Sequence, residues 1–313
     1  VQNTRPTLRV GLFFALNSQH EPFITICTMM RVSLVDTTAR QHLLPLTFTR
    51  PVAELRTGIL TIADKYRKRG CEVSYVTEPY LQEKYLAVTD AQVSIWASVC
   101  PTNEFIKAVK DLQPGEALVR GQQRLAVAGS DFEAGGKDIE FAGELNFIEY
   151  PWDIWLKNAP EMELDFDLLT AGRESAPVDP TNTVIGDRIF LEEGARATAS
   201  ILNTTTGPIY LAKGAEIMEG CVVRGGLALG EHSALKIGAK IYGATTLGPH
   251  CKVGGEVNNS VLIGYSNKGH DGFLGNSALG EWCNLGADTN NSKLKNNYDS
   301  VKAWSYVSKR FAP

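Results

Sequence analysis

Residues 211–255 have the sequence LAKGAEIMEGCVVRGGLALGEHSALKIGAKIYGATTLGPHCKVGG. An aliphatic residue stands at every sixth position of this stretch: Leu211, Ile217, Val223, Leu229, Leu235, Ile241, Leu247 and Val253. After an interruption the pattern resumes at Phe273, Leu279 and Leu285, and a weaker start is visible at Ile185 and Leu191. A period of six matches neither the repeat of a helix nor the simple alternation of a long strand. It is typical of a parallel β-helix, in which each six-residue unit forms one short strand and one turn.

This β-helix would point its aliphatic residues into the interior, where they stack on their equivalents above and below. Glycine, asparagine and aspartate between them accept the unusual dihedral angles of the turns. The flat sides of stacked parallel strands favour association, so we expect a homotrimer. The alternative reading of the pattern is an ordinary β-sandwich with irregular turns.

The residues before the repeat follow a different pattern, in which strands and helices alternate. We expect strands over 31–36, 71–77 and 91–99, helices over 51–70 and 103–112, and a β-hairpin over 116–128. Such alternation indicates an α/β domain with a mostly parallel sheet. The predicted organisation is therefore an α/β domain over 29–170 that includes a helical connector, a polar linker over 171–183, and the β-helix over 184–300.

The two ends of the chain fall outside these domains. Residues 10–27, VGLFFALNSQHEPFITIC, are apolar but interrupted by polar residues, and they make a poor signal peptide. We expect the natural protein to start at Met29 or Met30, with residues 1–28 as an extension that has no stable fold. The alternative is an extra strand that packs on the α/β domain. We expect residues 301–313 to be a truncated C-terminal end.

Length, net charge and cysteine content disfavour several classes of protein. A length of 313 residues favours two domains, and a net charge of −4 disfavours a nucleic-acid binder. No window has the run of apolar residues that a transmembrane helix needs, so no membrane partner is expected. The six cysteines are scattered and contain no CxxC motif. We interpret them as reduced thiols of a cytoplasmic protein, in an arrangement that disfavours zinc.

An α/β domain followed by a hexapeptide β-helix resembles the sugar-nucleotidyltransferase group. The best-known members are the bifunctional N-acetylglucosamine-1-phosphate uridyltransferase/glucosamine-1-phosphate acetyltransferases, a hexapeptide-repeat family. The resemblance covers roughly residues 29–300, and it is carried by HLLPLTFTRPVAELRTGILTIADKY (42–66), IEYPWDIW (148–155) and NNSKLKNNYD (290–299). It implies a Rossmann-like nucleotidyltransferase domain and a left-handed β-helix. The implied activity is nucleotidyl transfer to a sugar 1-phosphate, acyl transfer from acyl-coenzyme A to an amino sugar, or both.

In this group a glycine-rich loop holds the triphosphate, and an aspartate after a central strand holds Mg²⁺. The corresponding loop, DTTARQHLLPLTFTRP (36–51), contains no glycine, and VSIWASVCPTNEF (93–105) has no carboxylate before Glu104. We expect Arg40 and Arg50 to bind the phosphates, because a guanidinium suits them. Asp36, at the end of the first strand, is a candidate substitute ligand for Mg²⁺. The alternatives are a turn or cap role for Asp36 and structural roles for the arginines.

The stretch GHDGFLGNSALGEWCNLGADTNNSKLKNNYD (269–299) is similar in order and spacing to the acetyltransferase site of the bifunctional enzymes. The resemblance assigns His270 as the base, Asn284 as the asparagine of the coil, Ala287 as the small residue beside the thioester of acetyl-coenzyme A, and Asn297 and Tyr298 as sugar-binding residues. Removal of a proton during attack on a thioester needs a base with a near-neutral pKa, which histidine provides.

Two departures weaken that match: Phe273 replaces a tyrosine, and EVNNS (256–260) has asparagines where the family has a lysine. An exposed loop histidine among turn asparagines is the alternative. The sequence thus leaves two functional hypotheses: a transferase of sugar-nucleotide metabolism, or a catalytically degenerate sugar-nucleotide-binding or scaffold protein.

Overall fold

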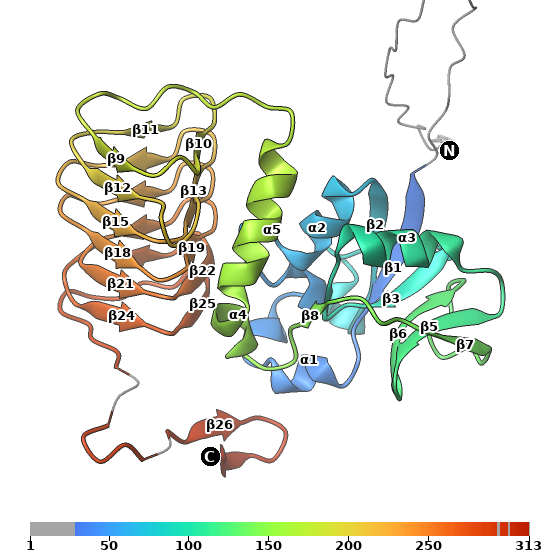
Figure 1. Cartoon of the computed structure of the whole chain (residues 1–313). Helices are drawn as coiled ribbons and strands as arrows, with labels where there is room; N and C mark the ends of the chain where they lie inside the picture. Colours follow the sequence, from blue (N-terminus) through green and yellow to red (C-terminus); the bar gives the residue numbers. More distant parts are fainter. Residues whose placement is uncertain (1–28, 293–294, 300, 313) are drawn as a thin grey trace, which may run out of the picture.

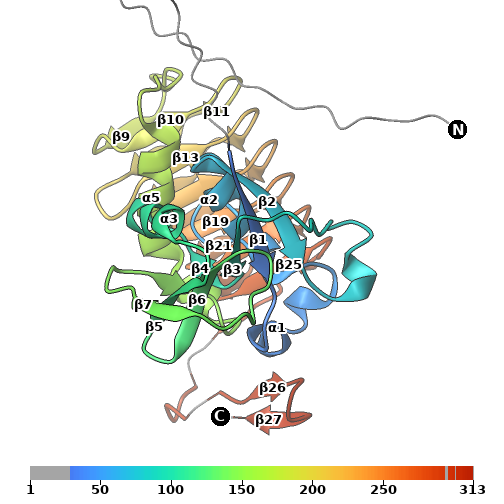
Figure 2. The same cartoon turned by 90° about the vertical axis from the view of Figure 1, so that its right-hand side faces the viewer.

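The computed structural model describes residues 29–292, 295–299 and 301–312 (Figure 1). The expected extension over residues 1–28 lies outside this range. Figure 1 shows a stack of short strands beside an open sheet, with one long helix running between them, and Figure 2 gives the view turned by 90°. The mixed α/β sheet followed by stacked parallel strands confirms the predicted fold class. The left-handed sense of the β-helix remains an expectation from the resemblance.

The α/β domain is built on a sheet with the strand order β2-β1-β3-β6-β5-β7. Its strands are β1 (Met30–Val35), β2 (Cys71–Val76), β3 (Val93–Trp96), β5 (Glu116–Arg120), β6 (Gln123–Ala128) and β7 (Lys137–Glu140). Strand β1 pairs in parallel with both β2 and β3, and β6 runs antiparallel to β3 and β5. A short antiparallel pair, β4 (Val99–Cys100) with β8 (Asn146–Phe147), lies outside this sheet.

Helices surround this sheet. They are α1 (Ala39–His42), α2 (Ile62–Lys68), α3 (Asn103–Asp111), α4 (Asp153–Leu156) and α5 (Asn158–Thr170), with short 3₁₀ turns η1 (Leu46–Phe48), η2 (Val52–Glu54) and η3 (Pro79–Leu81). The predicted helix over 51–70 is wrong in its first half, because α2 begins only after Thr61, whose hydroxyl accepts the Asp64 N–H at 3.1 Å. Gly58 turns the chain before it with a φ of +74°, and a Cβ there would meet the Asp165 carboxylate.

The β-helix has three faces of parallel strands. The first face contains β9 (Thr183–Ile185), β12 (Ile201–Asn203), β15 (Val222–Arg224), β18 (Lys240–Tyr242), β21 (Glu256–Asn258) and β24 (Phe273–Gly275). The second face contains β10 (Ile189–Leu191), β13 (Ile209–Leu211), β16 (Leu227–Leu229), β19 (Thr245–Leu247), β22 (Val261–Gly264) and β25 (Ala278–Glu281). The third face contains β11 (Arg196–Ala197), β14 (Glu216–Ile217), β17 (Ala234–Leu235), β20 (Lys252–Val253) and β23 (Asn267–Lys268).

The predicted aliphatic column fills the interior of the β-helix. All eight residues from Leu211 to Val253 at the six-residue spacing are buried in one core cluster. The continuation is wrong at Phe273, because the neighbouring Leu274 pairs with Val257 and takes the interior position. After Val253 the interior residues are fewer than six positions apart, as at Val257 and Leu262, so a strict period of six no longer falls on interior positions. At the start, Ile185 is exposed.

A polar residue breaks this column. Lys268 pairs with Val253 and is 1% exposed, although a lysine is rarely buried in full. Its ammonium donates hydrogen bonds at 3.0 Å to the carbonyl oxygens of Gly254 and His270. Burial lowers the pKa of Lys268.

Helix α5 joins the two parts by packing on the second face (Figure 1). Met162, Phe166 and Leu169, on one side of the helix, share an apolar cluster with Phe190 and Tyr210 of the β-helix. Polar contacts extend this interface, because the Thr246 hydroxyl donates to the Gly58 carbonyl at 2.7 Å, and the Asn158 amide donates to the Ala244 carbonyl at 2.8 Å. Residues 171–183 then run to the first coil, where Ala176 and Val178 pack against the interior column.

A short hairpin follows the last coil, formed by β26 (Ala303–Ser305) and β27 (Arg310–Ala312). Among the described residues, we find no helix of the length and apolarity needed to cross a membrane. Cys71, Cys100, Cys221, Cys251 and Cys283 are all free thiols, while Cys27 lies outside the described range.

Candidate functional site

The carboxyl ends of β1, β2 and β3 meet at one edge of the sheet. Because these strands are parallel, the residues that follow them lie side by side: Asp36 after β1, Thr77 after β2, and the turn at Ala97 and Ser98 after β3. The Asp36 N–H donates to the Val76 carbonyl, and the Ala97 N–H donates to the Val35 carbonyl. In open α/β sheets, ligands bind outside this edge, so it is the first candidate site.

The side chain of Asp36 is buried at the centre of this edge. One carboxylate oxygen accepts the Val52 N–H at 2.9 Å, and the other accepts the Thr77 hydroxyl at 2.6 Å. The Arg40 guanidinium lies 3.5 Å from the second oxygen. Burial outweighs these favourable contacts and raises the pKa of Asp36 to about 6. The carboxylate therefore ties the loops after β1 and β2 together, which agrees with the cap role that the sequence left open.

Arg40 connects the same two loops. Its Nη2 donates to the Thr47 carbonyl at 2.8 Å and to the Tyr80 hydroxyl at 2.7 Å, and its Nη1 lies 3.6 Å from the Glu78 carboxylate. The Thr47 hydroxyl in turn donates to the Arg40 carbonyl. Arg40 is 7% exposed, so its guanidinium is an internal support of this edge. The chain thus stabilises the loop with side-chain bonds where the resembling family uses glycines.

Buried donors remain unpaired at this edge. Within the described residues, Trp96 Nε1 and Ser98 Oγ have no hydrogen-bond partner, and Arg40 Nε makes only the 3.5 Å ionic contact with Asp36. An unmade hydrogen bond of a buried group costs about 1–3 kcal/mol, so such groups are rare and need an explanation. Trp96 is the last residue of β3 and stacks on Phe147, and Ser98 lies in the turn that follows, where its carbonyl accepts the Ile148 N–H. Acceptor oxygens of a ligand would satisfy donors at such a position.

Arg50 is not directed at the Asp36 cluster. Its Nη1 lies 3.3 Å from a carboxylate oxygen of Glu281, in the last strand of the second face. Arg56 makes a similar link, because its Nε donates to the Ile263 carbonyl at 3.2 Å. Two of the arginines in the loop after β1 therefore bind the β-helix, and the structure brings together only Asp36 and Arg40 of the residues predicted for this site.

The Asp36 cluster offers little to a divalent cation. Mg²⁺ prefers oxygen ligands, usually one or two carboxylates beside substrate phosphates. Here both oxygens of Asp36 already accept hydrogen bonds, and the nearby Glu78 is paired with Arg40. A search of the described residues finds no group of three or more histidine, cysteine, aspartate and glutamate side chains that could hold a metal. The arrangement therefore does not fit Mg²⁺.

The sequence analysis missed Thr77, Glu78 and Tyr80. All three belong to the segment that directly follows β2, and the sequence had predicted that strand correctly. Parallel pairing of β1 and β2 places this segment beside Asp36, so the end of the neighbouring strand was the available signal. No comparable signal pointed to Glu281, which reaches Arg50 from a distant part of the chain.

The second candidate site is at the end of the β-helix. His270 is exposed on the turn after β23, and its carbonyl accepts the bond from the buried Lys268 ammonium. Asn284 is also exposed, and it accepts a hydrogen bond at 2.8 Å from the amide of Asn267 in the coil above. This pair is an asparagine ladder that fits the turn role as well as a binding role.

Ala287, Asn297 and Tyr298 complete the residues predicted for this site. Ala287 is exposed on the final turn of the β-helix, and Asn297 bonds Asp299 beyond the coil. Tyr298 is 84% exposed. Among the contacts of the described residues, none joins His270 to Asn284, Asn297 or Tyr298. The structure therefore does not join these residues by direct hydrogen bonds.

A column of stacked rings marks another corner of the β-helix. His232, His250, Tyr265 and Trp282 stack in turn, with ring centroids 5.2, 5.2 and 4.9 Å apart. All four have a positive φ, which the corner between the second and third faces requires. The column accounts for two further histidines of the chain as structural residues.

Comparison with known proteins concerns the α/β domain. A family described as sugar nucleotidyl transferase has a model that matches residues 32–174. The match begins within β1 and ends just after α5, so it contains the Asp36 cluster and excludes the β-helix. A search of curated proteins finds no match to the chain. The α/β domain is thus a sugar nucleotidyltransferase-like domain, as the sequence predicted.

Proposed function

We propose that the α/β domain transfers a nucleotidyl group from a nucleoside triphosphate to a sugar 1-phosphate. A phosphate oxygen of the sugar 1-phosphate would attack the α-phosphorus, and pyrophosphate would leave. The observation that carries the proposal is the match of residues 32–174 to a sugar nucleotidyl transferase family. The unpaired donors of Trp96 and Ser98 support the carboxyl edge of the sheet as the binding site.

The chain's own residues have two roles in this proposal. Asp36 and Thr77 hold the loops after β1 and β2 in a fixed arrangement, which lowers the entropy cost of binding. Donors at the edge would receive the phosphate oxygens, where a fixed hydrogen bond is strengthened by exclusion of water. Arg40 would act mainly as a positioning residue, since its Nη groups are engaged inside the protein.

The test is release of pyrophosphate from each of the four nucleoside triphosphates with a panel of sugar 1-phosphates. Arg40→Gln should lower the rate at least tenfold, because it frees the Tyr80 segment from the loop after β1. Arg31→Gln is the matched control, since Arg31 forms an exposed ion pair with Asp90 outside the site. Absence of product from the folded wild-type protein with every substrate pair would overturn the proposal.

A second function, sugar-nucleotide binding without turnover, is favoured by a separate observation. Arg40 and Arg50, the cations expected to meet the phosphates, are both buried in internal contacts. Thermal shift measurements with nucleotides and nucleotide sugars distinguish the two functions. Stabilisation by these ligands with no pyrophosphate release favours the binding protein, and release above background excludes it.

A second activity, acyl transfer at the β-helix, is supported only by the resemblance to the bifunctional acetyltransferases. His270 would be the base, with acyl-coenzyme A as co-substrate, and Asn284, Ala287, Asn297 and Tyr298 would assemble around it on ligand binding. Transfer from radiolabelled acetyl-coenzyme A to glucosamine 1-phosphate tests it, and His270→Ala should reduce the rate by about 10² to 10⁴. An unchanged rate in His270→Ala would exclude His270 as the base.

The proposed state of the protein is a cytoplasmic homotrimer, and the free cysteines support a reducing compartment.

A further inference from the structure

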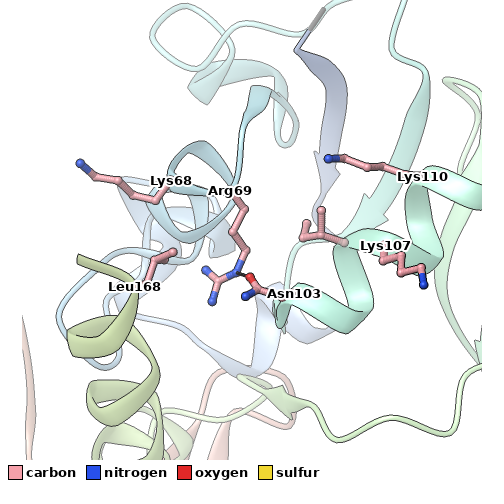
Figure 3. A pocket seen from close by; sticks show the side chains of 7 residues that line it. Lys68, Arg69, Asn103, Lys107, Lys110 and Leu168 are labelled. Carbon is pink, nitrogen blue, oxygen red and sulfur yellow. Dashed lines mark hydrogen bonds between the residues drawn. The ribbon is translucent and has the colours of Figure 1, made fainter. Parts of the chain in front are cut away.

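A hollow of about 470 Å³ lies on the α/β domain away from both sites (Figure 3). Three elements line it: the end of α2 with Lys68 and Arg69, the α3 helix with Asn103, Lys107 and Lys110, and Leu168 of α5. Arg69 stands just before β2, whereas Asp36 follows the opposite end of the paired β1. The six residues of strand between these ends put the hollow about 20 Å from the Asp36 cluster.

The hollow is positively charged, whereas the whole chain carries a net negative charge. Four of its lining residues are cations and none is a carboxylate, although the protein carries a net charge of −4. Within the described residues, Lys68, Lys107 and Lys110 form no ion pair. Like charges that share one concave surface repel one another, and the low-dielectric walls strengthen the field there. An anion in the hollow would relieve that repulsion.

The Arg69 guanidinium is held in place in the wall of the hollow by hydrogen bonds. Its Nε donates to the Asn103 side-chain oxygen at 3.1 Å, and its Nη1 donates to the Lys65 carbonyl at 3.0 Å. Figure 3 shows the bonded pair of Arg69 and Asn103 between the two helices, with Lys110 extending from α3 toward the space between them and with Lys68 and Lys107 at the rim, pointing outward. These bonds hold the guanidinium plane and leave Nη2 without a protein partner in the described part of the chain. A guanidinium with a free edge binds phosphate oxygens well.

Helix capping explains only part of this arrangement. Lys68 and Lys110 lie in the last turns of α2 and α3, where a cation favours the helix dipole. That effect does not account for Lys107, which lies in the middle of α3, or for the convergence of both helices on Arg69. The lysines at the rim have flexible stems, so their ammonium groups can turn toward a bound anion.

We propose that this hollow, which we name the α2–α3 pocket, binds a small anion that carries two or more phosphate groups. One phosphate would contact Arg69 and Asn103, and the second would lie between Lys107 and Lys110. The volume suits pyrophosphate or a hexose bisphosphate, and the two share the recognised chemistry. The site is independent of the proposed nucleotidyl transfer, because none of its residues belongs to the Asp36 cluster.

Isothermal titration of the full chain with pyrophosphate, without divalent cations, tests the proposal. The double variant Lys107→Gln/Lys110→Gln should weaken binding at least tenfold. Lys213→Gln/Lys252→Gln removes the same charge from exposed positions of the β-helix and should bind like the wild type. Equal weakening in both double variants would mean attraction by the net charge alone, and it would overturn the site.

Lysine labelling locates the binding directly. Pyrophosphate should protect Lys107 and Lys110 from acetylation by an anhydride, as read by mass spectrometry, while Lys213 stays reactive. Protection by a hexose bisphosphate at lower concentration than pyrophosphate would identify a phosphorylated sugar as the occupant, and the reverse order would identify free pyrophosphate. Unchanged labelling of both lysines with saturating amounts of both anions contradicts the pocket, even where nucleotidyl transfer is active.

Discussion

Asp36→Asn should change how the stability of this protein depends on pH. Burial raises the pKa of Asp36 from 3.8 to about 6, so the folded chain keeps its proton at pH values where the unfolded chain has lost it. A raised pKa in the folded state gives stability that is fully present below pH 3.8 and is lost as pH rises through 6. The rise in the pKa from 3.8 to about 6 corresponds to about 3 kcal/mol in all. About 1.4 kcal/mol of this should be lost between pH 5 and pH 8.

Urea denaturation of the wild type and Asp36→Asn at pH 5, 6, 7 and 8 measures this loss. The free energy of unfolding of the wild type should fall relative to the variant across this series, because asparagine has no proton to release. Asp90→Asn is the matched control, since Asp90 is exposed and its replacement changes the net charge equally. A wild-type minus Asp36→Asn difference that stays constant from pH 5 to pH 8 would refute the reasoning. The folded state would then leave the pKa of Asp36 at its ordinary value.

Three further predictions concern the β-helix. Leu247→Asp should unfold the β-helix, as measured by a circular dichroism melt, because a buried charge in the interior column costs several kcal/mol out of a free energy of unfolding of about 5–15 kcal/mol. Replacement of the exposed Glu231 by aspartate should leave the melting temperature at its wild-type value. The wild type should gain stability relative to Lys268→Met as pH rises toward 10.5, because burial lowers the pKa of Lys268, and a flat difference would contradict that burial. Light scattering of the full chain should give three times 34.1 kDa, and a mass of one chain would exclude the trimer.

The sequence was most informative where a regular pattern reflects a single physical requirement. Each aliphatic residue from Leu211 to Val253 has to fill the same interior position, so the period alone located the column. The pattern failed near Phe273 because the intervening turns are shorter and the buried Lys268 occupies one interior position. A hydrophobic pattern cannot identify a lysine as a core residue when backbone carbonyls satisfy its ammonium.

The Asp36 cluster was only half predictable for a different reason. The order of strands and helices placed Asp36 and Arg40 at a strand end, and the structure joins them. The residue types suggested phosphate binding, but exposure decides whether a guanidinium can meet a ligand, and the sequence does not give exposure. Burial of Arg40 and Arg50 depends on loops and a domain that fold against them from distant parts of the chain.

The ion pair of Arg50 and Glu281 links the loop after β1 to the β-helix. The same loop is bound on its other side by Asp36 and Arg40, which connect it to the segment after β2. A movement of the loop that opened the carboxyl edge would have to break contacts to both neighbours. Removal of the partly exposed Glu281 carboxylate would leave the buried Arg50 guanidinium without this partner, so a change in the β-helix reaches this loop. The β-helix therefore acts as a support of the candidate site, in addition to any activity at its own end.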